Sequence, residues 1–391
     1  HKYDALDYQQ ISPEYGSRED LAKLAAETRR RGMKLVLDGV FNHMGRNSPA
    51  FKEAQAGSGP RRDWFVFGSQ YKAGYRAWWN VENLPELNLE NPAVRDHLWN
   101  GKDSVVRRYL REGVDGWRLD VAFDIGMAHL DELTRAAHAE KPGSLVVGEI
   151  ANYPREWFPA VDGVMHFTLR GMLLRIADQT WDAATAQRMI ERLIRDADYE
   201  HLLKSWIYLD NHDTARIATL VPDERARHLL QVLQFTLPGA PNLYYGSEVA
   251  MTGGEDPEMR GPMDWDRVAA RHPELEWTRQ LIAARKMLRA LRIGDYRSLE
   301  ARRLIAFQRH TDRAAESVIV LVNPAGEAVK ETLLLPDSKA MDGTRLVDAF
   351  GQGEFRVQSA LLQVDMPPKS FRVLTPVTVT PEGYSNYKRV R

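Results

Sequence analysis

Four acidic residues stand at or just after the ends of short apolar runs, at Asp38, Asp120, Glu149 and Asp213. Arg118 precedes Asp120 by two positions, and residues i and i+2 of a strand share one face. Opposite charges on one face of a buried strand cost free energy unless that face opens onto a polar site. Paired carboxylates in one cleft are the tool of glycoside hydrolysis, in which one attacks the anomeric carbon or activates water and the other protonates the departing oxygen.

The surroundings of these residues suggest how the roles divide. Arg118 is expected to lower the pKa of the adjacent Asp120 carboxyl and to keep it ionised, as a nucleophile requires. Glu149 follows a strand of Leu, Val, Val and Gly, and an apolar setting raises a carboxyl pKa, which suits a general acid. His43 and His212 could hydrogen-bond sugar hydroxyls.

Several of these residues, together with the neighbouring Asn42 and Asp210, also have a structural interpretation, which the pattern leaves open. The alternatives are a salt bridge between Arg118 and Asp120, a helix cap at Glu149, a buried core histidine at His43, a turn at Asn42, and loop caps at Asp210 and Asp213.

The elements that must position these residues alternate along the chain. The predicted strands cover residues 34–38, the segment after Gly113 that carries Asp120, and residues 144–148, 163–167, 205–209 and 241–246. The predicted helices cover about 17–31, 91–112, 127–140, 182–196, 223–235 and 275–291. The first of them starts with a capping box of Ser17 and Asp20. This alternation predicts an α/β barrel, in which functional residues lie at the C-terminal ends of the strands.

A (β/α)8 TIM barrel needs two strands more than these six, and we expect both upstream of His1, with an open variant as the alternative. The irregular segment at about 44–84 predicts a functional insertion. After Gly294 only strands are expected, at 304–310, 317–323, 329–335, 346–350, 361–366 and 370–374. The predicted domains are therefore a catalytic barrel over 1–294, an antiparallel β-sandwich over 295–380 and a tail over 381–391.

Composition excludes several classes of function. The 391 residues carry a formal net charge of −1 and no polybasic run, which gives no sign of a nucleic-acid or membrane partner. The chain has no cysteine, so disulfides, thiolate zinc sites and cysteine nucleophiles are excluded. The compartment stays open between cytoplasmic and periplasmic or secreted.

Four segments together resemble the α-amylase family, glycoside hydrolase family 13. They are Asp38-Gly-Val-Phe-Asn-His43, Gly116-Trp-Arg-Leu-Asp-Val-Ala122, Val147-Gly-Glu-Ile150 and Leu209-Asp-Asn-His-Asp213, in order and each at a predicted strand end. The resemblance implies Asp120 as nucleophile, Glu149 as general acid/base and Asp213 as transition-state stabiliser. It also implies a structural role for Asp38 and sugar contacts from Arg118, His43, His212 and the stacking platform Tyr3.

Within the family, the segment from Tyr244 to Trp265 is similar to the cyclomaltodextrinase, neopullulanase and maltogenic amylase group. That similarity implies that Asp256 and Arg260 hold the sugar one step beyond the cleaved residue. The chain departs from the group at Leu84-Pro-Glu-Leu-Asn88, at Ala151 and at Phe123-Asp124, positions that shape the acceptor side of the cleft. The resemblance therefore leaves the choice of substrate open.

The implied activity is retaining hydrolysis of α-1,4 bonds in maltodextrins, cyclodextrins or starch, with some transglycosylation. The Asp120 and Glu149 carboxyls are then expected about 5–6 Å apart, whereas about 9 Å would contradict retention. Two alternatives are a family member that forms trehalose or sucrose isomers by transfer, and a non-catalytic sugar-binding homologue.

No cofactor is expected to be required. A structural calcium is possible because Asn42 matches a calcium ligand of many α-amylases, although the insertion offers no convincing set of further oxygen ligands. A turn or supporting role for Asn42 is the favoured interpretation. The expected partner is an α-glucan oligosaccharide or polysaccharide, and a homodimer is possible.

Overall fold

The computed structural model describes residues 2–57, 59–351 and 353–390. The chain divides into two compact units, His1–Met165 and His166–Arg391, which are described one at a time. Along the chain, strands and helices alternate up to α14, and the described residues after it form strands and one short 3₁₀ turn. None of the described helices is long and apolar enough to cross a membrane.

Three parallel strands form the centre of the first unit. They are β1 (Val36–Gly39), β2 (Gly116–Leu119) and β3 (Leu145–Ile150), with β2 paired to both others. The helices of this unit are α1 (Arg18–Arg30), α2 (Pro49–Gln55), α3 (Pro92–Arg95), α4 (Val105–Arg111), α5 (Ala122–Ile125) and α6 (Met127–Glu140). The strand β4 (Gly163–His166) follows in the sequence, and its last residue is the first of the second unit. The predicted capping box is confirmed, because Ser17 and Asp20 bond reciprocally at the start of α1.

The helix predicted over 91–112 is interrupted. After α3 the chain makes one wide turn at Asp96–Asn100 and leaves helical geometry at Gly101, which has φ −61° and ψ 151°. A Cβ at residue 101 would lie 2.5 Å from the Asp96 carbonyl oxygen, so the close approach at this turn requires glycine. A second helix, α4, then begins after Ser104.

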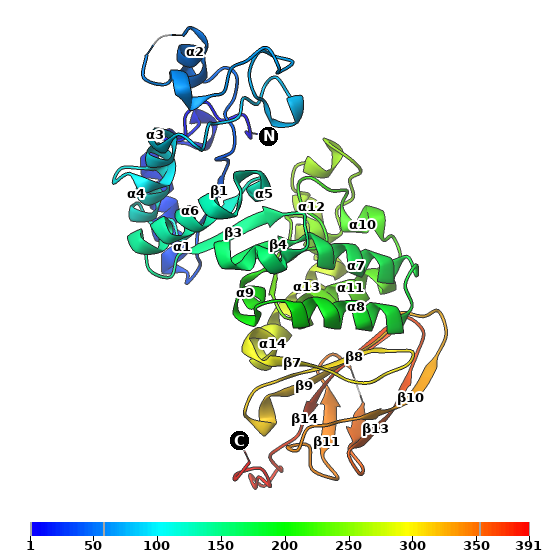
Figure 1. Ribbon diagram of the computed structural model, residues 1–391. Coiled ribbons are helices and arrows are strands. Elements are labelled where there is room, and N and C mark those ends of the chain that lie inside the picture. Colours follow the sequence, from blue (N-terminus) through cyan, green and yellow to red (C-terminus); the bar gives the residue numbers. More distant parts are fainter. Residues whose placement is uncertain (1, 58, 352, 391) are drawn as a thin grey trace. The chain divides into compact units, whose positions relative to one another are not determined.

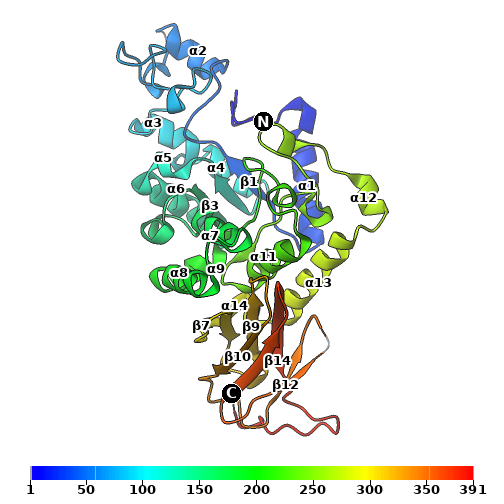
Figure 2. The same ribbon diagram turned by 90° about the vertical axis from the view of Figure 1, so that its right-hand side faces the viewer.

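The predicted insertion folds as a small lobe with its own apolar centre. Phe51 of α2 packs edge-on against Phe65 and Tyr75, with ring centroids 5.0 and 4.6 Å apart. Isolated antiparallel bridges join Ala77 to Pro85 and His43 to Glu86, which brings the end of the lobe back beside its beginning. Both views show α2 at the far end of this unit, beyond α3 (Figures 1 and 2).

The second unit contains the parallel pair β5 (Trp206–Ile207) and β6 (Ala240–Pro241), both shorter than predicted. Its helices are α7 (Phe167–Ala177), α8 (Ala183–Asp196), α9 (Tyr199–Lys204), α10 (Ile217–Leu220), α11 (Glu224–Thr236), α12 (Trp265–Ala269), α13 (Pro273–Met287) and α14 (Ala290–Ile293). The predicted strand 241–246 ends early because Tyr244 and Tyr245 turn onto the buried Arg216, whose guanidinium lies 4.3 and 4.7 Å from their ring centroids.

The remaining strands of this unit form antiparallel sheets. One sheet has the order β12-β11-β14-β9-β8-β7 and a second pairs β10 with β13. These strands are β7 (Asp295–Ser298), β8 (Ile305–His310), β9 (Ser317–Asn323), β10 (Val329–Leu334), β11 (Arg345–Asp348), β12 (Glu354–Arg356), β13 (Leu361–Met366) and β14 (Ser370–Pro376).

Strand alternation explains why β8 belongs to two cores. Leu304 and Ala306 pack into the core shared with β10 and β13, whereas Ile305 and Phe307 face the core that contains residues of α8 and α11. Figure 1 shows α8 and α14 beside β7, β8 and β9.

Candidate active site

The centre of the first unit's polar cluster is Arg118, whose side chain is 6% exposed. Its Nη1 donates to both oxygens of Asp38, at 2.7 and 3.0 Å, and to Asp120 Oδ1 at 3.0 Å. Its Nη2 forms an ion pair with Glu149 Oε2 at 2.9 Å. One guanidinium therefore gathers three of the four predicted carboxylates.

Strand register explains this gathering. Asp38 pairs with Arg118 across β1 and β2, so their side chains share one face of the sheet. Leu119 pairs with Gly148 across β2 and β3, and the next residues on these two chains are Asp120 and Glu149. The sequence prediction that carboxylates meet at strand ends is confirmed for Asp38, Asp120 and Glu149.

The predicted low pKa of Asp120 is wrong for this structure. Burial raises the pKa of the Asp120 carboxyl, Arg118 opposes this shift, and the neighbouring carboxylates Glu149 and Asp38 add to it, so that the pKa is about 7. A single guanidinium shared among three carboxylates does not offset the loss of water around a side chain that is 10% exposed.

Tyr3 completes this cluster from the start of the chain. Its hydroxyl donates to Asp38 Oδ2 at 2.7 Å, and the Arg118 guanidinium lies 5.9 Å from its ring centroid. Burial, with Asp38 nearby, raises the pKa of the Tyr3 hydroxyl well above its usual range. The structure therefore brings Tyr3 to Arg118 and Asp38, as the resemblance implies.

His43 is almost fully buried. Its Nε2 donates to the Tyr3 carbonyl at 3.1 Å and its Nδ1 faces the Asn42 amide at 3.5 Å. Burial lowers the pKa of the His43 imidazole to about 4, so the ring is neutral near neutral pH. The structural interpretation of His43 accounts for these contacts, and its contact with sugar stays a prediction.

The second unit carries the other predicted residues. Arg260 donates from Nη2 to Asp213 Oδ1 at 2.9 Å and from Nε to Asp256 Oδ1 at 2.8 Å. His212 Nε2 lies 3.1 Å from Asp213 Oδ2. This unit thus brings together Asp213, His212, Asp256 and Arg260, of which Asp213 is 44% exposed.

The structure distinguishes which of the acidic residues act as helix or loop caps. Asp210 is a structural residue, because its carboxylate accepts from the backbone N–H of Ile217, the first residue of α10, and from the Ser247 hydroxyl. Glu149 accepts from the backbone N–H of Val121 rather than capping the helix that follows it in sequence. Asp213 forms ion pairs with Arg260 and His212, which the loop-cap interpretation does not explain.

Trp78 was not predicted as part of the site. Its ring stacks on His43, with centroids 5.7 Å apart and planes at 29°, and its Nε1 donates to Asp124 Oδ2 at 2.8 Å. The sequence signal was the aromatic run in a polar insertion, which does not say which ring meets which histidine.

The residues that the structure describes contain no group of three or more His, Cys, Asp or Glu side chains able to hold a metal ion. The Asn42 amide nitrogen faces His43, and its backbone oxygen accepts from the Leu87 N–H at 2.9 Å. A structural calcium ion therefore stays a prediction.

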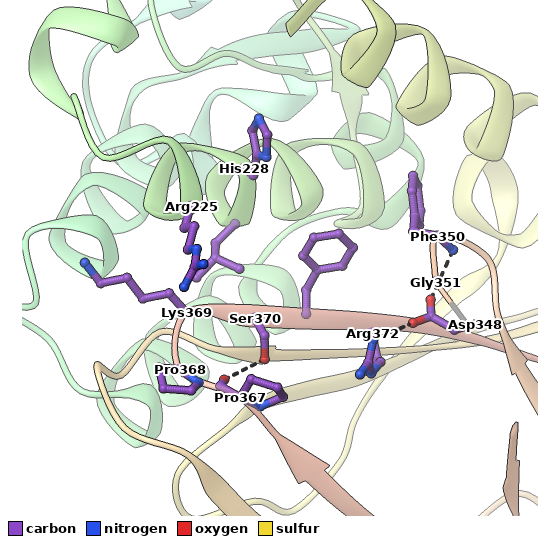
Figure 3. A pocket seen from close by; sticks show the side chains of 12 residues that line it. Arg225, His228, Asp348, Phe350, Gly351, Pro367, Pro368, Lys369, Ser370 and Arg372 are labelled. Carbon is purple, nitrogen blue, oxygen red and sulfur yellow. Dashed lines mark hydrogen bonds and ion pairs between the residues drawn. The ribbon is translucent and has the colours of Figure 1, made fainter. Parts of the chain in front are cut away.

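A cavity of about 350 Å³ in the second unit is separate from these residues. It lies between α11 and the turn before β14, with Arg225 and His228 on the helix and Phe350, Lys369 and Arg372 on the strand side (Figure 3). Arg372 is committed to Asp348 at 3.1 Å and Lys369 to Asp223. No predicted site residue lines it.

Comparison with known proteins decides the family. Residues 1–281 match the family model described as the alpha amylase catalytic domain. The chain belongs to the alpha-amylase family. Its fold is accordingly that family's barrel followed by an antiparallel β domain, as predicted.

Several members of the alpha-amylase family are similar over nearly the whole chain. Neopullulanase 2 of Thermoactinomyces vulgaris is 32% identical over 96% of this chain and 65% of its own length. Cyclomaltodextrinase of Geobacillus thermopakistaniensis is 32% identical over 95% of this chain and 64% of its own. The chain thus spans just under two thirds of these relatives.

A solved structure is also similar. The cyclic α-maltosyl-(1→6)-maltose hydrolase of Arthrobacter globiformis matches with a TM-score of 0.81 and 30% identity, over 96% of this chain and 82% of that one. The predicted resemblance to the cyclomaltodextrinase and neopullulanase group is confirmed by the relatives' names.

Proposed function

We propose that the protein is a retaining α-glucan hydrolase that cleaves α-1,4 bonds of maltodextrins, cyclodextrins or starch, with some transfer to other sugars. The observation that carries the proposal is the contact of one buried guanidinium, that of Arg118, with both Asp120 and Glu149. A pair of adjacent carboxyls at neighbouring strand ends is the equipment for double displacement. The family and the names of the relatives support the same activity.

In the proposed reaction, Asp120 attacks the anomeric carbon while Glu149 gives its proton to the departing glycosidic oxygen. The bond from carbon to that oxygen breaks as the bond to Asp120 forms, leaving a covalent glucosyl ester. Glu149 then takes a proton from water, whose oxygen displaces Asp120 from the same carbon. Two inversions restore the α configuration, and a sugar hydroxyl in place of water gives transfer.

The raised pKa of Asp120 bears on this division of roles. Arg118 contacts both carboxyls in a buried setting, and burial raises the pKa of the Asp120 carboxyl to about 7. The proposed reaction requires the proton on Glu149 rather than on Asp120 once sugar is bound.

We assign the remaining predicted residues in the same way. Asp213 grips sugar hydroxyls and stabilises the transition state, and Arg260 and Asp256 hold the next sugar. These roles rest on the resemblance and on the ion pairs that already join Arg260 to both acids.

The proposal is tested by product analysis on maltoheptaose, β-cyclodextrin, pullulan and maltose, with the anomer first released followed by NMR. New reducing ends of α configuration are expected, and Asp120→Asn should abolish turnover. Release of the β anomer, or near-normal turnover in the Asp120→Asn variant, would overturn the mechanism. No cleavage of any of these glucans would overturn the function, and isomerised disaccharides as the main products would favour the transferase alternative.

A further inference from the structure

Trp79, at a turn of the inserted lobe, is strongly exposed to solvent. Trp79 is 75% exposed, the largest exposed fraction among the large apolar side chains of the described residues. Most large aromatic side chains are highly buried, and exposing one leaves apolar area in water. Single exposed apolar residues are common, so exposure alone proves nothing about binding.

The backbone at this turn is a second observation. Trp79 has φ 49° and ψ 30°, and Asn80 has φ 60°, so two successive residues occupy the left-handed region. That conformation suits glycine and is an outlier for a bulky side chain. The chain therefore retains a large exposed ring at a position where glycine would relieve backbone strain.

The turn is nevertheless firmly held. Trp78 N–H donates to the Leu84 carbonyl at 2.9 Å and Val81 N–H to the Trp78 carbonyl at 2.9 Å. Asn80 N–H donates to the Ala77 carbonyl at 3.1 Å. Trp79 is therefore presented by an ordered backbone, which reduces the entropy lost when a ligand binds to its face.

The neighbours of Trp79 connect it to the candidate active site. Its ring centroid lies 6.2 Å from that of Trp78, and Trp78 in turn stacks on His43 and bonds Asp124. Three rings thus follow one another outward from His43. Trp78 is fixed by its own contacts, whereas the Trp79 ring has Trp78 as its one ring partner among the described residues.

We propose that Trp79 is a stacking platform for a glucosyl unit beyond the one that is cleaved, and that it sets the preference for longer α-glucans. Sugar rings have a flat apolar face, and aromatic rings bind such faces by burying apolar area without hydrogen bonds. The inference rests on the proposed function, since it assumes an α-glucan in the site beside His43. It adds a specificity-determining residue that contacts substrate remote from the bond that breaks.

The test compares Trp79→Ala, Trp79→Phe and Trp79→Gly by kcat/KM on maltotriose and maltoheptaose. Trp79→Ala is expected to lower kcat/KM for maltoheptaose about tenfold, mainly through KM, while maltotriose changes less than about twofold. Trp79→Phe should retain most of the preference. Trp79→Gly should lose it without a lower melting temperature, because the strain is relieved.

The matched control is Trp265→Ala, which removes another strongly exposed tryptophan, 70% exposed and in the second unit. It should leave both substrates unchanged. Calorimetry of maltoheptaose binding in an Asp120→Asn background gives a readout that does not depend on turnover. An unchanged ratio of the two substrates in Trp79→Ala, or an equal loss on both, overturns the platform alone. A wild-type protein inactive on both glucans overturns the proposed function as well.

Discussion

Replacing the proposed nucleophile should stabilise the protein at neutral and alkaline pH. In the folded chain burial raises the pKa of Asp120 from its ordinary value of 3.8 to about 7. A folded pKa above the unfolded one means that the folded state binds the proton more tightly. Binding of this proton therefore stabilises the folded state fully below about pH 4, and the stabilisation is lost as pH rises through about 7.

The size of the effect follows from the difference between the two pKa values. About three pKa units at about 1.4 kcal/mol each give up to about 4 kcal/mol of strain from the buried carboxylate above pH 7. Asp120→Asn keeps the shape of the protonated acid and cannot ionise. The variant and wild type should thus be equally stable near pH 4, and the variant should gain up to about 4 kcal/mol by pH 8.

The assay is urea unfolding, followed by tryptophan fluorescence, of wild type and Asp120→Asn at several pH values from 4.5 to 8.5. Asp348→Asn is the control, because this variant is expected to lower the free energy of unfolding rather than raise it. The Asp348 carboxylate accepts from Arg372 and from the backbone N–H groups of Phe350 and Val373, so losing its charge should destabilise the protein by about 1–3 kcal/mol at neutral pH. A stability difference for Asp120→Asn that is independent of pH, or an Asn variant less stable at pH 8, would refute the electrostatic reasoning.

Three further changes test other contacts. Tyr3→Phe removes the hydrogen-bond donor to Asp38 and should lower the free energy of unfolding by about 1 kcal/mol, while its KM stays near that of wild type. Tyr3→Ala, which removes the ring, should raise KM. Equal KM values in the two variants would exclude a stacking platform at Tyr3. Arg260→Lys cannot span both of its acids and should lower kcat/KM for maltoheptaose about tenfold, so wild-type kinetics would count against its assignment. Ser17→Ala breaks the capping box of α1 and should cost about 1 kcal/mol in urea unfolding, with Ser17→Gly costing only a few tenths; an equal loss in both would point to a cause other than the cap.

The sequence by itself determined the order of the elements and the residues at the strand ends. Local signals sufficed for the helix that begins after Ser17 and for strands such as Ser317–Asn323, which begin and end as predicted. Asp120 and Glu149 were found in the same way, because an apolar run that ends in a carboxylate is a local pattern. The spacing of Arg118 and Asp120 likewise required only the two-residue repeat of a strand.

Only the tertiary structure decided what these groups experience. The sign of the Asp120 pKa shift depends first on burial and then on Asp38 and Glu149 sharing Arg118, and Asp38 lies 80 positions from that arginine. The stacking of Trp78 on His43 and the bridge from Arg260 to Asp213 also join distant segments. Burial and electrostatic energy depend on everything that surrounds a group in space, which no local pattern encodes.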